Sequence, residues 1–358
     1  MEKILQGNYG IARGAWEAGV KVASAYPGTP SSEILTAIAA EYREDIRSEW
    51  SPNEKVAVEV AIGASIAGAR ALSSMKHVGL NVASDPFMTL AYTGVKGGLV
   101  IVVCDDPNVH SSQNEQDSRQ WARFAKVPML EPADSQECKE FTKIAFDISE
   151  QFDTPVVLRG ETRVSHSFSP VMLEERRESV IPLGLDVKES AKFTMVPVNV
   201  RVRRQFVEER MKKLEAFADD FKYNVMEIND KEFGVITSGA AYNYTKEVFP
   251  NYSYLKLGMV WPLPRKLLSN FFKTVKKVII VEELDPFLET EIRAMGFKVF
   301  HGKDVIPNMF ELSPEIVEKS LKGRRYKAPE ERIRIEDLPK RPPNLCPGCS
   351  HRALFYAL

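Results

Sequence analysis

Short apolar segments alternate with helix-like segments along most of this 358-residue chain. Strands that alternate with helices form a mostly parallel sheet with helices on both faces. The pattern therefore predicts an α/β fold. The strands predicted in the first half are residues 20–26, 78–83, 99–104 and 155–158, and the long helices are residues 54–72 and 135–151.

The same alternation returns in a second, compact α/β unit at residues 233–312. Between the two units, residues 166–232 read as a linker with a charged surface helix at 201–220, because a run of charges is usually a solvated face. We expect the first domain to span residues 1–165 and residues 313–358 to act as a connector into a further domain. The strands predicted in the second unit are residues 233–237, 253–257, 278–281 and 298–300.

The charge balance excludes several classes of protein. Lys and Arg (48) nearly equal Asp and Glu (49), so the chain carries a formal net charge of -1 and has no general attraction to nucleic acid or anionic lipid. No apolar run approaches the roughly 18 residues of a spanning helix, and the N-terminus lacks the apolar region of a secretion signal. We expect a cytoplasmic protein that binds neither nucleic acid nor membrane.

The four cysteines are too few for a disulfide scaffold, so reduced thiols are expected. Cys346 and Cys349 form a CxxC motif, but no third and fourth ligand lies nearby. A closed metal or cluster site cannot be completed locally. We therefore predict no metal site within this chain and keep the pair only as a candidate for a position near an iron-sulfur cluster.

Common nucleotide and metal signatures are missing: there is no GxGxxG, Walker A or HExxH motif. Glu54 stands instead at the start of a predicted helix whose small residues recur at helical spacing, at Ala57, Ala61, Ala64 and Gly68. A glutamate in the first turn often only complements the helix dipole. The alternative is a buried carboxylate that faces a nitrogen heterocycle, and the spacing alone leaves both interpretations open.

Two polar loops follow predicted strands. The segment YPGTPSS, residues 26–32, places three hydroxyls at a helix entrance, an arrangement that is more often a capped turn than a binding site. The segment HSSQNEQDSR, residues 110–119, follows the strand that ends at Cys104. Open α/β sheets bind ligands beyond the carboxyl ends of their strands, which makes the second loop a candidate ligand site.

Taken together, these motifs resemble the thiamine-diphosphate-dependent 2-oxoacid:ferredoxin oxidoreductases, and within them the group whose alpha subunits act on indolepyruvate. The resemblance runs over nearly the whole chain, and several long matches in one order are more specific than any single motif. The segments that carry it are YPGTPSSEI, EWSPNEKVAVEVAIGAS, MKHVGLNVASDPFMTLAYTGVKGGLVIVV, HSSQNEQDSR, KLGMVWPLP, VEELDPFLE and CPGCSHRALF.

The resemblance implies a subunit of an enzyme that oxidatively decarboxylates arylpyruvates, such as indolepyruvate and phenylpyruvate, to aryl-acetyl-CoA and CO2. It implies a parallel-sheet domain at residues 1–165 that binds the aminopyrimidine of thiamine diphosphate, and a transketolase C-terminal-like domain at residues 233–312. The implied cofactors are thiamine diphosphate with Mg2+, whose diphosphate half is bound outside these residues, and iron-sulfur clusters, with coenzyme A as co-substrate. The implied partners are a smaller beta subunit and ferredoxin, in a hetero-oligomer with at least two copies of this chain.

The family also implies roles for individual residues. The glutamate of its NExxAxxxAxG pattern falls on Glu54, whose implied role is to hydrogen-bond a ring nitrogen of the pyrimidine and favour its imino tautomer. Gly28 and Thr29 are implied to contact the cofactor. Thr29 also matches a threonine that contacts the substrate carboxylate in related pyruvate enzymes.

One contact of the family does not carry over. Where those enzymes have a substrate-binding arginine, this sequence has Asp105. His110, Gln113 and Asn114 are our hypothesis for replacement substrate contacts, because they lie just beyond the same strand. An unchanged Michaelis constant after His110→Ala and Gln113→Ala would argue against it.

The family's motif for diphosphate and Mg2+, GDG followed by a distant Asn, does not occur in these residues, and neither does its ferredoxin-like cysteine run. We expect either a fragment of a longer subunit, truncated just inside its diphosphate-binding domain, or a partner polypeptide that supplies the rest, and no turnover by these residues alone. Two alternatives stay open: an oxidoreductase for another 2-oxoacid, such as pyruvate or a branched-chain acid, and a non-catalytic scaffold subunit. The complete pattern around Glu54 counts against the scaffold.

Overall fold

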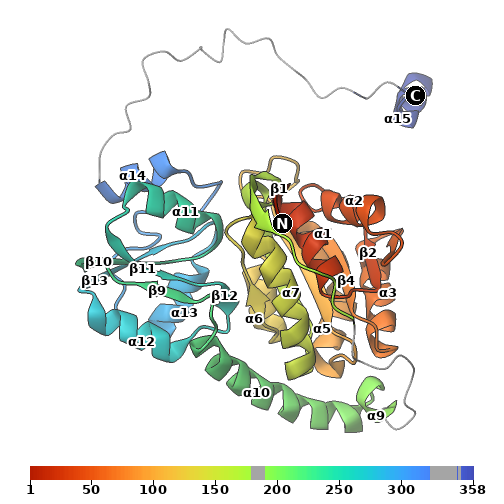
Figure 1. Cartoon of the computed structure of the whole chain (residues 1–358), viewed down its shortest axis with the longest axis horizontal. Coiled ribbons are helices and arrows are strands. Elements are labelled where there is room, and N and C mark those ends of the chain that lie inside the picture. The colour runs from red at the N-terminus through yellow and green to blue at the C-terminus, as the bar shows by residue number, and fades with distance from the viewer. Residues whose placement is uncertain (179–189, 323–344, 346–347) are drawn as a thin grey trace. The chain divides into compact units, whose positions relative to one another are not determined.

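Residues 1–178, 190–322, 345 and 348–358 are described in a computed structural model of the chain. The chain divides into two compact units, Met1–Gly323 and Arg324–Leu358. The first unit contains a seven-stranded sheet and a four-stranded sheet (Figure 1). The described residues of the second unit include one helix, α15 (Ser350–Ala357).

The larger sheet has the strand order β12-β6-β7-β5-β4-β2-β3. Neighbouring strands are parallel, except that β12 and β6 are antiparallel. The sheet is thus mostly parallel, as the alternation of strands and helices predicts. Its strands are β2 (Val22–Ala25), β3 (Arg47–Trp50), β4 (Ala71–Lys76), β5 (Leu99–Asp105), β6 (Met129–Leu130), β7 (Val156–Glu161) and β12 (Met259–Trp261).

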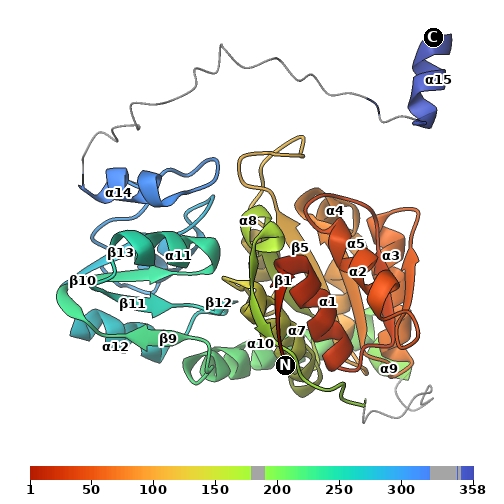
Figure 2. The ribbon, with the colours of Figure 1, turned by 45° about the horizontal axis from the view of Figure 1, so that its top comes forward.

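Helices cover both faces of this sheet because its central strands are apolar on both sides. Residues 99, 101 and 103 of β5 pack into one cluster with α3 (Glu54–Ile66) and α5 (Ser84–Thr93). Residues 100, 102 and 104 pack into another with α1 (Gly7–Glu17) and α7 (Ser135–Phe152), which lie side by side in Figures 1 and 2. Successive side chains of a strand point to opposite faces, so the two clusters lie on opposite sides of the sheet.

The smaller sheet has the order β13-β10-β11-β9, with β9 antiparallel to β11 and the other pairs parallel. Figure 2 shows it between α11 and α14 on one side and α12 on the other. The short strand β12 follows β11 in the chain but pairs with β6, so it links the two sheets. The elements of this part are β9 (Val225–Glu227), β10 (Asp230–Thr237), α11 (Gly239–Val248), β11 (Tyr252–Lys256), α12 (Arg265–Thr274), β13 (Lys277–Val281), α13 (Phe287–Ala294) and α14 (Pro314–Lys322).

A third, two-stranded antiparallel sheet joins β1 to β8. No helix among the described residues has the length and apolar content that would span a membrane. The predicted α/β fold class is confirmed. The remaining elements are β1 (Glu2–Gln6), α2 (Ser32–Glu41), α4 (His77–Val82), α6 (Arg119–Ala125), α8 (Thr162–His166), β8 (Phe168–Met172), α9 (Ser190–Phe193) and α10 (Pro197–Asp219).

Three predicted elements differ from the structure. The strand predicted at residues 78–83 is wrong, because residues 77–82 form α4 and the strand is β4 just before it. Every residue of β4 is buried between β2 and β5, but its serines and lysine hide the apolar pattern of a central strand. The helix predicted at 54–72 ends at Ile66, and the last two residues predicted for it belong to β4, which begins at Ala71. Residues 298–300 form no strand, and only a single bridge at His301 continues the sheet beside β13.

The charged segment predicted at residues 201–220 forms α10, whose Arg210 is only 2% exposed. This side chain donates hydrogen bonds to the carbonyl oxygens of Ala91 (2.9 Å), Asp153 (2.9 Å) and Lys126 (3.2 Å). These carbonyls lie at the ends of α5, α7 and α6, where helices leave carbonyl oxygens without partners. Burial lowers the pKa of Arg210 to about 10. One buried guanidinium therefore ties α10 to three helices.

A buried cluster of charges lies at the carboxyl ends of the strands. Arg159 of β7 is fully buried, and its guanidinium lies 2.7 Å from Asp105, 2.8 Å from Glu131 and 2.9 Å from Glu161. Burial raises the pKa of Glu161 to about 7, and the charge of Glu131 adds to this effect while Arg159 opposes it. Three carboxylates thus share one cation within the larger sheet.

The same carboxylates hold the smaller sheet in place. Glu131 accepts a hydrogen bond from the hydroxyl of Ser238 (2.9 Å), and Glu161 accepts one from the backbone N–H of Ala240 (3.2 Å). Between them, Gly239 has a positive φ of 51°, and a Cβ there would lie 2.4 Å from a carboxylate oxygen of Glu131. Only glycine suits both the backbone and this approach.

A second buried arginine makes a parallel connection. Arg119, at the start of α6, pairs with Asp117 and lies 2.7 Å from Glu282, which follows β13. It also donates a hydrogen bond to the carbonyl oxygen of Glu283 (2.8 Å). The two sheets are therefore joined by ionic contacts where the strands of both sheets end.

We expect Arg210→Ala to lower the free energy of unfolding by about 3–5 kcal/mol, because three carbonyl oxygens lose their donor and a buried volume is emptied. Denaturant unfolding followed by circular dichroism measures the change. Arg201→Ala, an exposed arginine on the same helix, is the control and should shift stability by less than about 0.5 kcal/mol. Equal effects of the two variants would contradict the role of Arg210.

The raised pKa of Glu161 predicts a pH dependence. Because its pKa is about 7 in the folded chain against an ordinary 4.5, its contribution to stability is complete below pH 4.5 and is lost as the pH rises through 7. Glu161→Gln should therefore gain stability relative to the parent chain between pH 5 and pH 8. Unfolding midpoints at both pH values test this, with the exposed Glu59→Gln as control. A constant difference between parent and variant across this range would contradict it.

Candidate functional site

Glu54 is the first residue of α3 and directly follows the residue that caps this helix. The side chain of Asn53 accepts a hydrogen bond from the backbone N–H of Val56 (3.0 Å). Glu54 is only 8% exposed, and among the residues that the structure describes its carboxylate has no hydrogen bond or ion pair. Its oxygens are not among the fully enclosed polar atoms that lack a partner, so they keep contact with solvent. These free acceptors are therefore available to a ligand.

A glycine of α4 packs directly against this carboxylate. A Cβ at Gly79 would lie 2.7 Å from both the Cγ and the Oε1 of Glu54, which is closer than side chains ever approach. Any other residue at this position would displace the carboxylate. Gly79 thus makes room for Glu54, a role that the sequence analysis missed although the segment around Gly79 was part of the resemblance.

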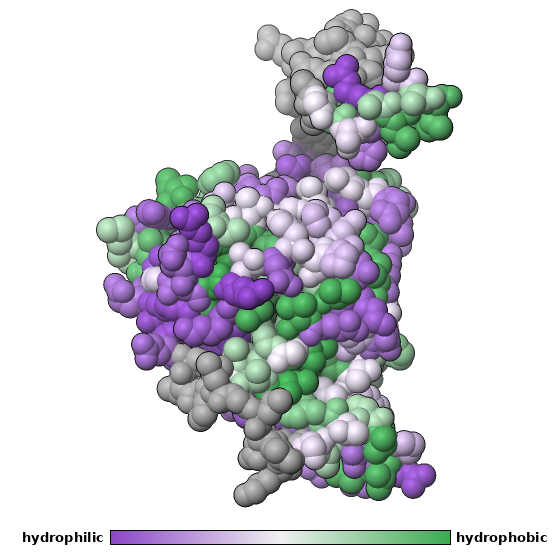
Figure 3. All heavy atoms as spheres, turned by 90° about the vertical axis from the view of Figure 1, so that its right-hand side faces the viewer, coloured by the Kyte–Doolittle hydropathy of each residue, from purple (hydrophilic) through white to green (hydrophobic). Residues whose placement is uncertain are grey.

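Several apolar side chains of α3 are partly exposed. Val56, Val60 and Ile62 are only half buried, and no atom lies within 4 Å of a Cβ placed at Gly63. The same helix also carries the exposed Glu59 and the partly exposed Lys55. Figure 3 views the side of the first unit on which α2 and α3 lie in Figure 1, and green apolar surface crosses it. Glu54 therefore begins a helix that presents both apolar and charged side chains.

The segment YPGTPSS connects β2 to α2 as a turn in which two serine hydroxyls hydrogen-bond to the backbone of the same segment. The backbone N–H of Gly28 donates to the hydroxyl of Ser32 (2.8 Å), and the hydroxyl of Ser31 donates to the carbonyl of Gly28 (2.7 Å). A Cβ at Gly28 would lie 3.1 Å from the Cδ of Lys76 at the end of β4. The turn and β4 are thus in close contact, and the exposed Thr29 is left for other contacts.

Lys76 is a further charged residue that the sequence analysis missed. It is 8% exposed, and its Nζ donates to the carbonyl oxygen of Ser111 (2.6 Å). Burial lowers the pKa of Lys76, and the nearby Asp106 opposes this shift. Its position as the last residue of a strand was the signal that could have identified it. Lys76 joins the loop after β5 to the turn after β2.

A cavity of about 390 Å3 lies beyond the carboxyl ends of β2, β5 and β7, where open α/β sheets bind ligands. It brings together Thr29 and His110, which are distant in the sequence and were both predicted as substrate contacts. Its lining residues are Thr29, His110, Ser111, Thr162, Arg163, His166 and Ser167.

Gln113 and Asn114 do not line this cavity. Both side chains are exposed, and the backbone carbonyl oxygen of Asn114 lies 3.1 Å from the Nε2 of the buried His77. Asn114 also accepts a hydrogen bond from Gln116 within the loop. In this structure the two residues shape the loop rather than face the cavity.

Asp105 does not replace the family's arginine in the cavity. It is fully buried, and its carboxylate accepts hydrogen bonds from Arg159 (2.7 Å) and from the backbone N–H of Ser118 (3.0 Å). Burial raises the pKa of Asp105, and Arg159 opposes this shift. The residue belongs to the buried ion cluster.

Arg163 is the cavity residue that the sequence analysis missed most clearly. It is the second residue of α8, directly after β7, and its side chain is 57% exposed. Its Nε donates to Glu311 (2.7 Å), and its Nη2 donates to the other oxygen of the same carboxylate. The Nε2 of His110 also lies 3.2 Å from Glu311. The position of Arg163 just after a parallel strand was a signal that could have found it.

The cysteines offer no site among the described residues. Cys104 and Cys138 are free and buried, and burial raises the pKa of the Cys104 thiol to about 12. Cys346 lies outside the described residues, and the Sγ of Cys349 lies 3.4 Å from the Nδ1 of His351. No group of three or more His, Cys, Asp or Glu side chains in the described part of the chain could hold a metal ion.

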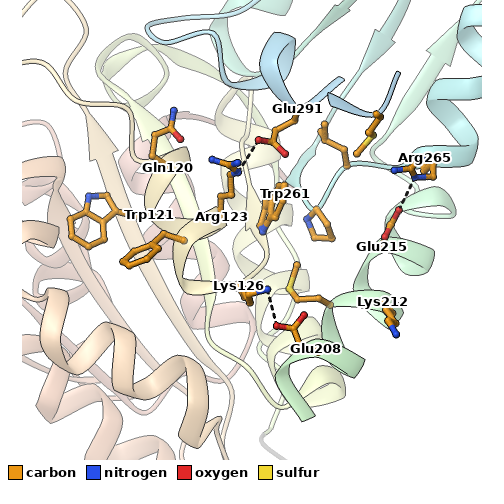
Figure 4. A pocket seen from close by; sticks show the side chains of 15 residues that line it. Gln120, Trp121, Arg123, Lys126, Glu208, Lys212, Glu215, Trp261, Arg265 and Glu291 are labelled. Atoms are coloured by element: carbon orange, nitrogen blue, oxygen red, sulfur yellow. Dashed lines mark hydrogen bonds and ion pairs between the residues drawn. The ribbon is translucent and has the colours of Figure 1, made fainter. Parts of the chain in front are cut away.

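A larger cavity, of about 1000 Å3, contains none of the predicted site residues (Figure 4). It lies among α6, α10, α13 and the segment after β12. Arg123 pairs with Glu291 at 2.8 Å, and Lys126 pairs with Glu208 at 2.8 Å, so most of its charges are satisfied within the chain. The predicted site residues Thr29 and His110 line the smaller cavity instead.

Comparisons with known proteins identify the family of the chain. Residues 13–229 match the family described as "Pyruvate flavodoxin/ferredoxin oxidoreductase, thiamine diP-bdg". The indolepyruvate oxidoreductase subunit IorA of Archaeoglobus fulgidus is 42% identical over 100% of this chain and 61% of that protein. The subunit of the same name from Methanothermobacter marburgensis is 44% identical over 99% of this chain and 60% of that protein. The chain thus spans about 60% of the length of these relatives.

Solved structures with the same fold differ widely in sequence. A 2-oxoglutarate:ferredoxin oxidoreductase from Magnetococcus marinus, with 2-oxoglutarate, coenzyme A and succinyl-CoA bound, has a TM-score of 0.70 at 17% identity and covers 90% of this chain and 65% of that chain. A split-gene transketolase, an inactive beta4 tetramer, has a TM-score of 0.56 at 13% identity and covers 88% of this chain and 96% of that chain. At these identities the likeness concerns the fold alone.

The family match spans more than half of the chain, and the unpartnered Glu54 lies within it. The chain therefore belongs to the pyruvate flavodoxin/ferredoxin oxidoreductase family, as a thiamine-diphosphate-binding member.

Proposed function

We propose that this chain is the pyrimidine-binding part of an oxidoreductase that decarboxylates arylpyruvates, such as indolepyruvate and phenylpyruvate, and passes the electrons to ferredoxin. In this proposal residues 1–165 bind the aminopyrimidine, and residues 233–312 form the transketolase C-terminal-like domain. The observation that carries the proposal is the nearly buried Glu54, whose carboxylate has no partner among the described residues and fits against the bare backbone of Gly79.

The residues around Glu54 suit a pyrimidine ring. A carboxylate in this setting accepts a hydrogen bond from a ring nitrogen and shares the proton, and the missing side chain at Gly79 leaves room for it in this position. Gly28 and Thr29 follow a neighbouring strand at the same edge of the sheet. When bound, thiamine diphosphate supplies a nucleophilic carbon and an electron sink for the loss of CO2.

The smaller cavity is proposed as the site of the 2-oxoacid. Thr29 and His110 line it together, so their proposed substrate contacts are geometrically compatible. Gln113 and Asn114 would have to move to reach it, because their side chains are exposed outside the lining. The volume of about 390 Å3 falls within the range of small-molecule sites.

The remaining parts of the proposed enzyme lie outside these residues. They are the diphosphate half of the cofactor site with Mg2+, the iron-sulfur clusters, the site for coenzyme A and the smaller beta subunit. The partly exposed Val56, Val60 and Ile62 of α3 support a hetero-oligomer, because another chain could cover these apolar side chains. In a complex with at least two copies of this chain, a diphosphate-binding domain from outside these residues would have to meet Glu54.

Relatives named for another 2-oxoacid match less of the chain. The 2-oxoglutarate synthase subunit KorA of Methanothermobacter thermautotrophicus is 29% identical over 49% of this chain. The much longer matches to subunits named for indolepyruvate favour an arylpyruvate over other 2-oxoacids. A non-catalytic scaffold would have no need of an unpartnered carboxylate at Glu54.

In the complete complex, we expect Glu54→Gln to reduce oxidative decarboxylation by at least about 100-fold, because the amide cannot share the proton of the pyrimidine ring. Glu59→Gln, an exposed position on the same helix, is the matched control and should retain activity. Circular dichroism and subunit assembly should be unchanged in both variants. Near-parental activity of Glu54→Gln would refute the assignment of Glu54.

Initial rates of ferredoxin or dye reduction by the complete complex test the substrate class. With coenzyme A present, indolepyruvate and phenylpyruvate should give kcat/KM values at least about tenfold above those of pyruvate, 2-oxoglutarate and a branched-chain 2-oxoacid, as expected when an aryl group buries more apolar area. A preference for one of the other acids would replace the arylpyruvate assignment. No activity with any 2-oxoacid in a complex that binds thiamine diphosphate would support the scaffold.

A further inference from the structure

Arg163 has one bound edge and one open edge. Its Nε and Nη2 atoms donate to the two oxygens of Glu311, which occupies one side of the planar guanidinium. Its Nη1 has no hydrogen bond or ion pair within the described part of the chain. A guanidinium carries five N–H donors in a fixed plane, so the edge formed by Nη1 and the second N–H of Nη2 remains available. That edge has the geometry that binds a carboxylate through two parallel hydrogen bonds.

Arg163 lines the cavity that also contains Thr29. Arg163 is the one arginine or lysine among the residues that line it, and its charge does not depend on pH in the physiological range. The two histidines of the lining already face carboxylates, since His110 lies 3.2 Å from Glu311 and His166 lies 3.7 Å from Glu33. The guanidinium is therefore the cavity's permanent positive charge.

The carboxylate behind this cavity does not compete for the open edge. Asp106 is 2% exposed and accepts hydrogen bonds from the backbone N–H of Ser111 (2.9 Å) and the hydroxyls of Ser112 (2.6 Å) and Thr162 (2.8 Å). These donors, together with the charge of Lys76, hold its pKa low in spite of burial. Asp106 is thus already satisfied by its own neighbours.

Glu311 is held firmly enough to position the guanidinium. The backbone N–H of Leu312 donates to the carboxylate of the buried Glu283 (3.0 and 3.1 Å), and the backbone N–H of Phe310 donates to Glu115 (3.1 and 3.2 Å). The segment that carries Glu311 is therefore fixed on both sides of it. A bidentate contact with a fixed carboxylate sets the orientation of the guanidinium and hence the direction of its open edge.

We propose that Arg163 binds the carboxylate of the 2-oxoacid substrate through this open edge, and that Glu311 is its positioning residue. The inference rests on the proposed function, because it assumes that the cavity beside Thr29 receives a 2-oxoacid. The inference places the contact with the substrate carboxylate just after β7. The position of the family's arginine is occupied here by Asp105, which pairs with Arg159 in the buried ion cluster.

The test uses the complete oxidoreductase complex and compares Arg163→Met with Arg123→Met. Arg123 is a matched control, because its side chain is 50% exposed, pairs with Glu291 at 2.8 Å and lines the other cavity (Figure 4). Arg163→Met should raise the KM for indolepyruvate or phenylpyruvate about 10- to 100-fold, as expected for the loss of a hydrogen-bonded charge, with kcat changed much less. Arg123→Met should leave both constants unchanged.

Inhibition by indole-3-lactate and by its amide separates a carboxylate contact from a structural effect. The parent complex should bind the acid more tightly than the amide, and Arg163→Met should lose most of this preference. Glu311→Gln should give a smaller loss, because the guanidinium keeps its charge but not its fixed orientation. Thiamine diphosphate binding should be unchanged in all variants.

The outcomes distinguish a wrong role for Arg163 from a wrong proposed function. An active parent complex with unchanged KM and unchanged acid preference in Arg163→Met overturns the role of Arg163 alone. A parent complex without activity on any 2-oxoacid overturns the proposed function first. An equal rise of KM in Arg123→Met would show a general effect of removing surface arginines and would also overturn the proposal.

Discussion

The buried guanidinium of Arg159 is the interaction on which the arrangement of the molecule depends. It neutralises carboxylates at the ends of three neighbouring strands, and without it Asp105, Glu131 and Glu161 could not be buried together. Two of these carboxylates then accept hydrogen bonds from the start of α11. The strand ends of the smaller sheet are thereby held against those of the larger sheet, and this contact delivers the segment with Glu311 to Arg163.

The residues that we propose for function carry charges that the fold leaves incompletely paired. Arg159 and Arg119 are fully buried and are matched to acidic partners, which suits them to a structural role. Glu54 and Arg163 differ, because one has no described partner and the other retains an open edge. Both lie at the carboxyl edge of the larger sheet, where a parallel sheet presents its loops to ligands. Glu54 suits a ring nitrogen, and Arg163 suits an anion.

Much of the fold and part of the site could be predicted from the sequence. The predictions of a strand at residues 99–104 and a helix at 135–151 are correct. Burial of a strand on both faces gives a continuous apolar run, and burial of a helix on one face gives a helical apolar period, so both can be recognised in the sequence. The strand at residues 71–76 was missed because its serines and lysine interrupt the apolar pattern of a central strand. These polar residues are buried because neighbouring strands pair with β4 on both sides. Glu54 stood out through its motif. Arg163 did not, because its importance comes from Glu311, which is 148 residues away in the chain.

The α/β class and the family could be read from the sequence, and Glu54 could be singled out as a candidate, because hydrophobic periodicity and long ordered motifs are local properties of a chain. Which polar residues share a cavity could not be read in this way. The tertiary structure brought Thr29, His110 and Arg163 together and left Gln113 and Asn114 outside. It also placed Asp105 in the buried ion cluster. These placements depend on which charges pair, and the pairing depends on the distances between strand ends. Packing of the whole sheet sets these distances, whereas spacing in the sequence does not.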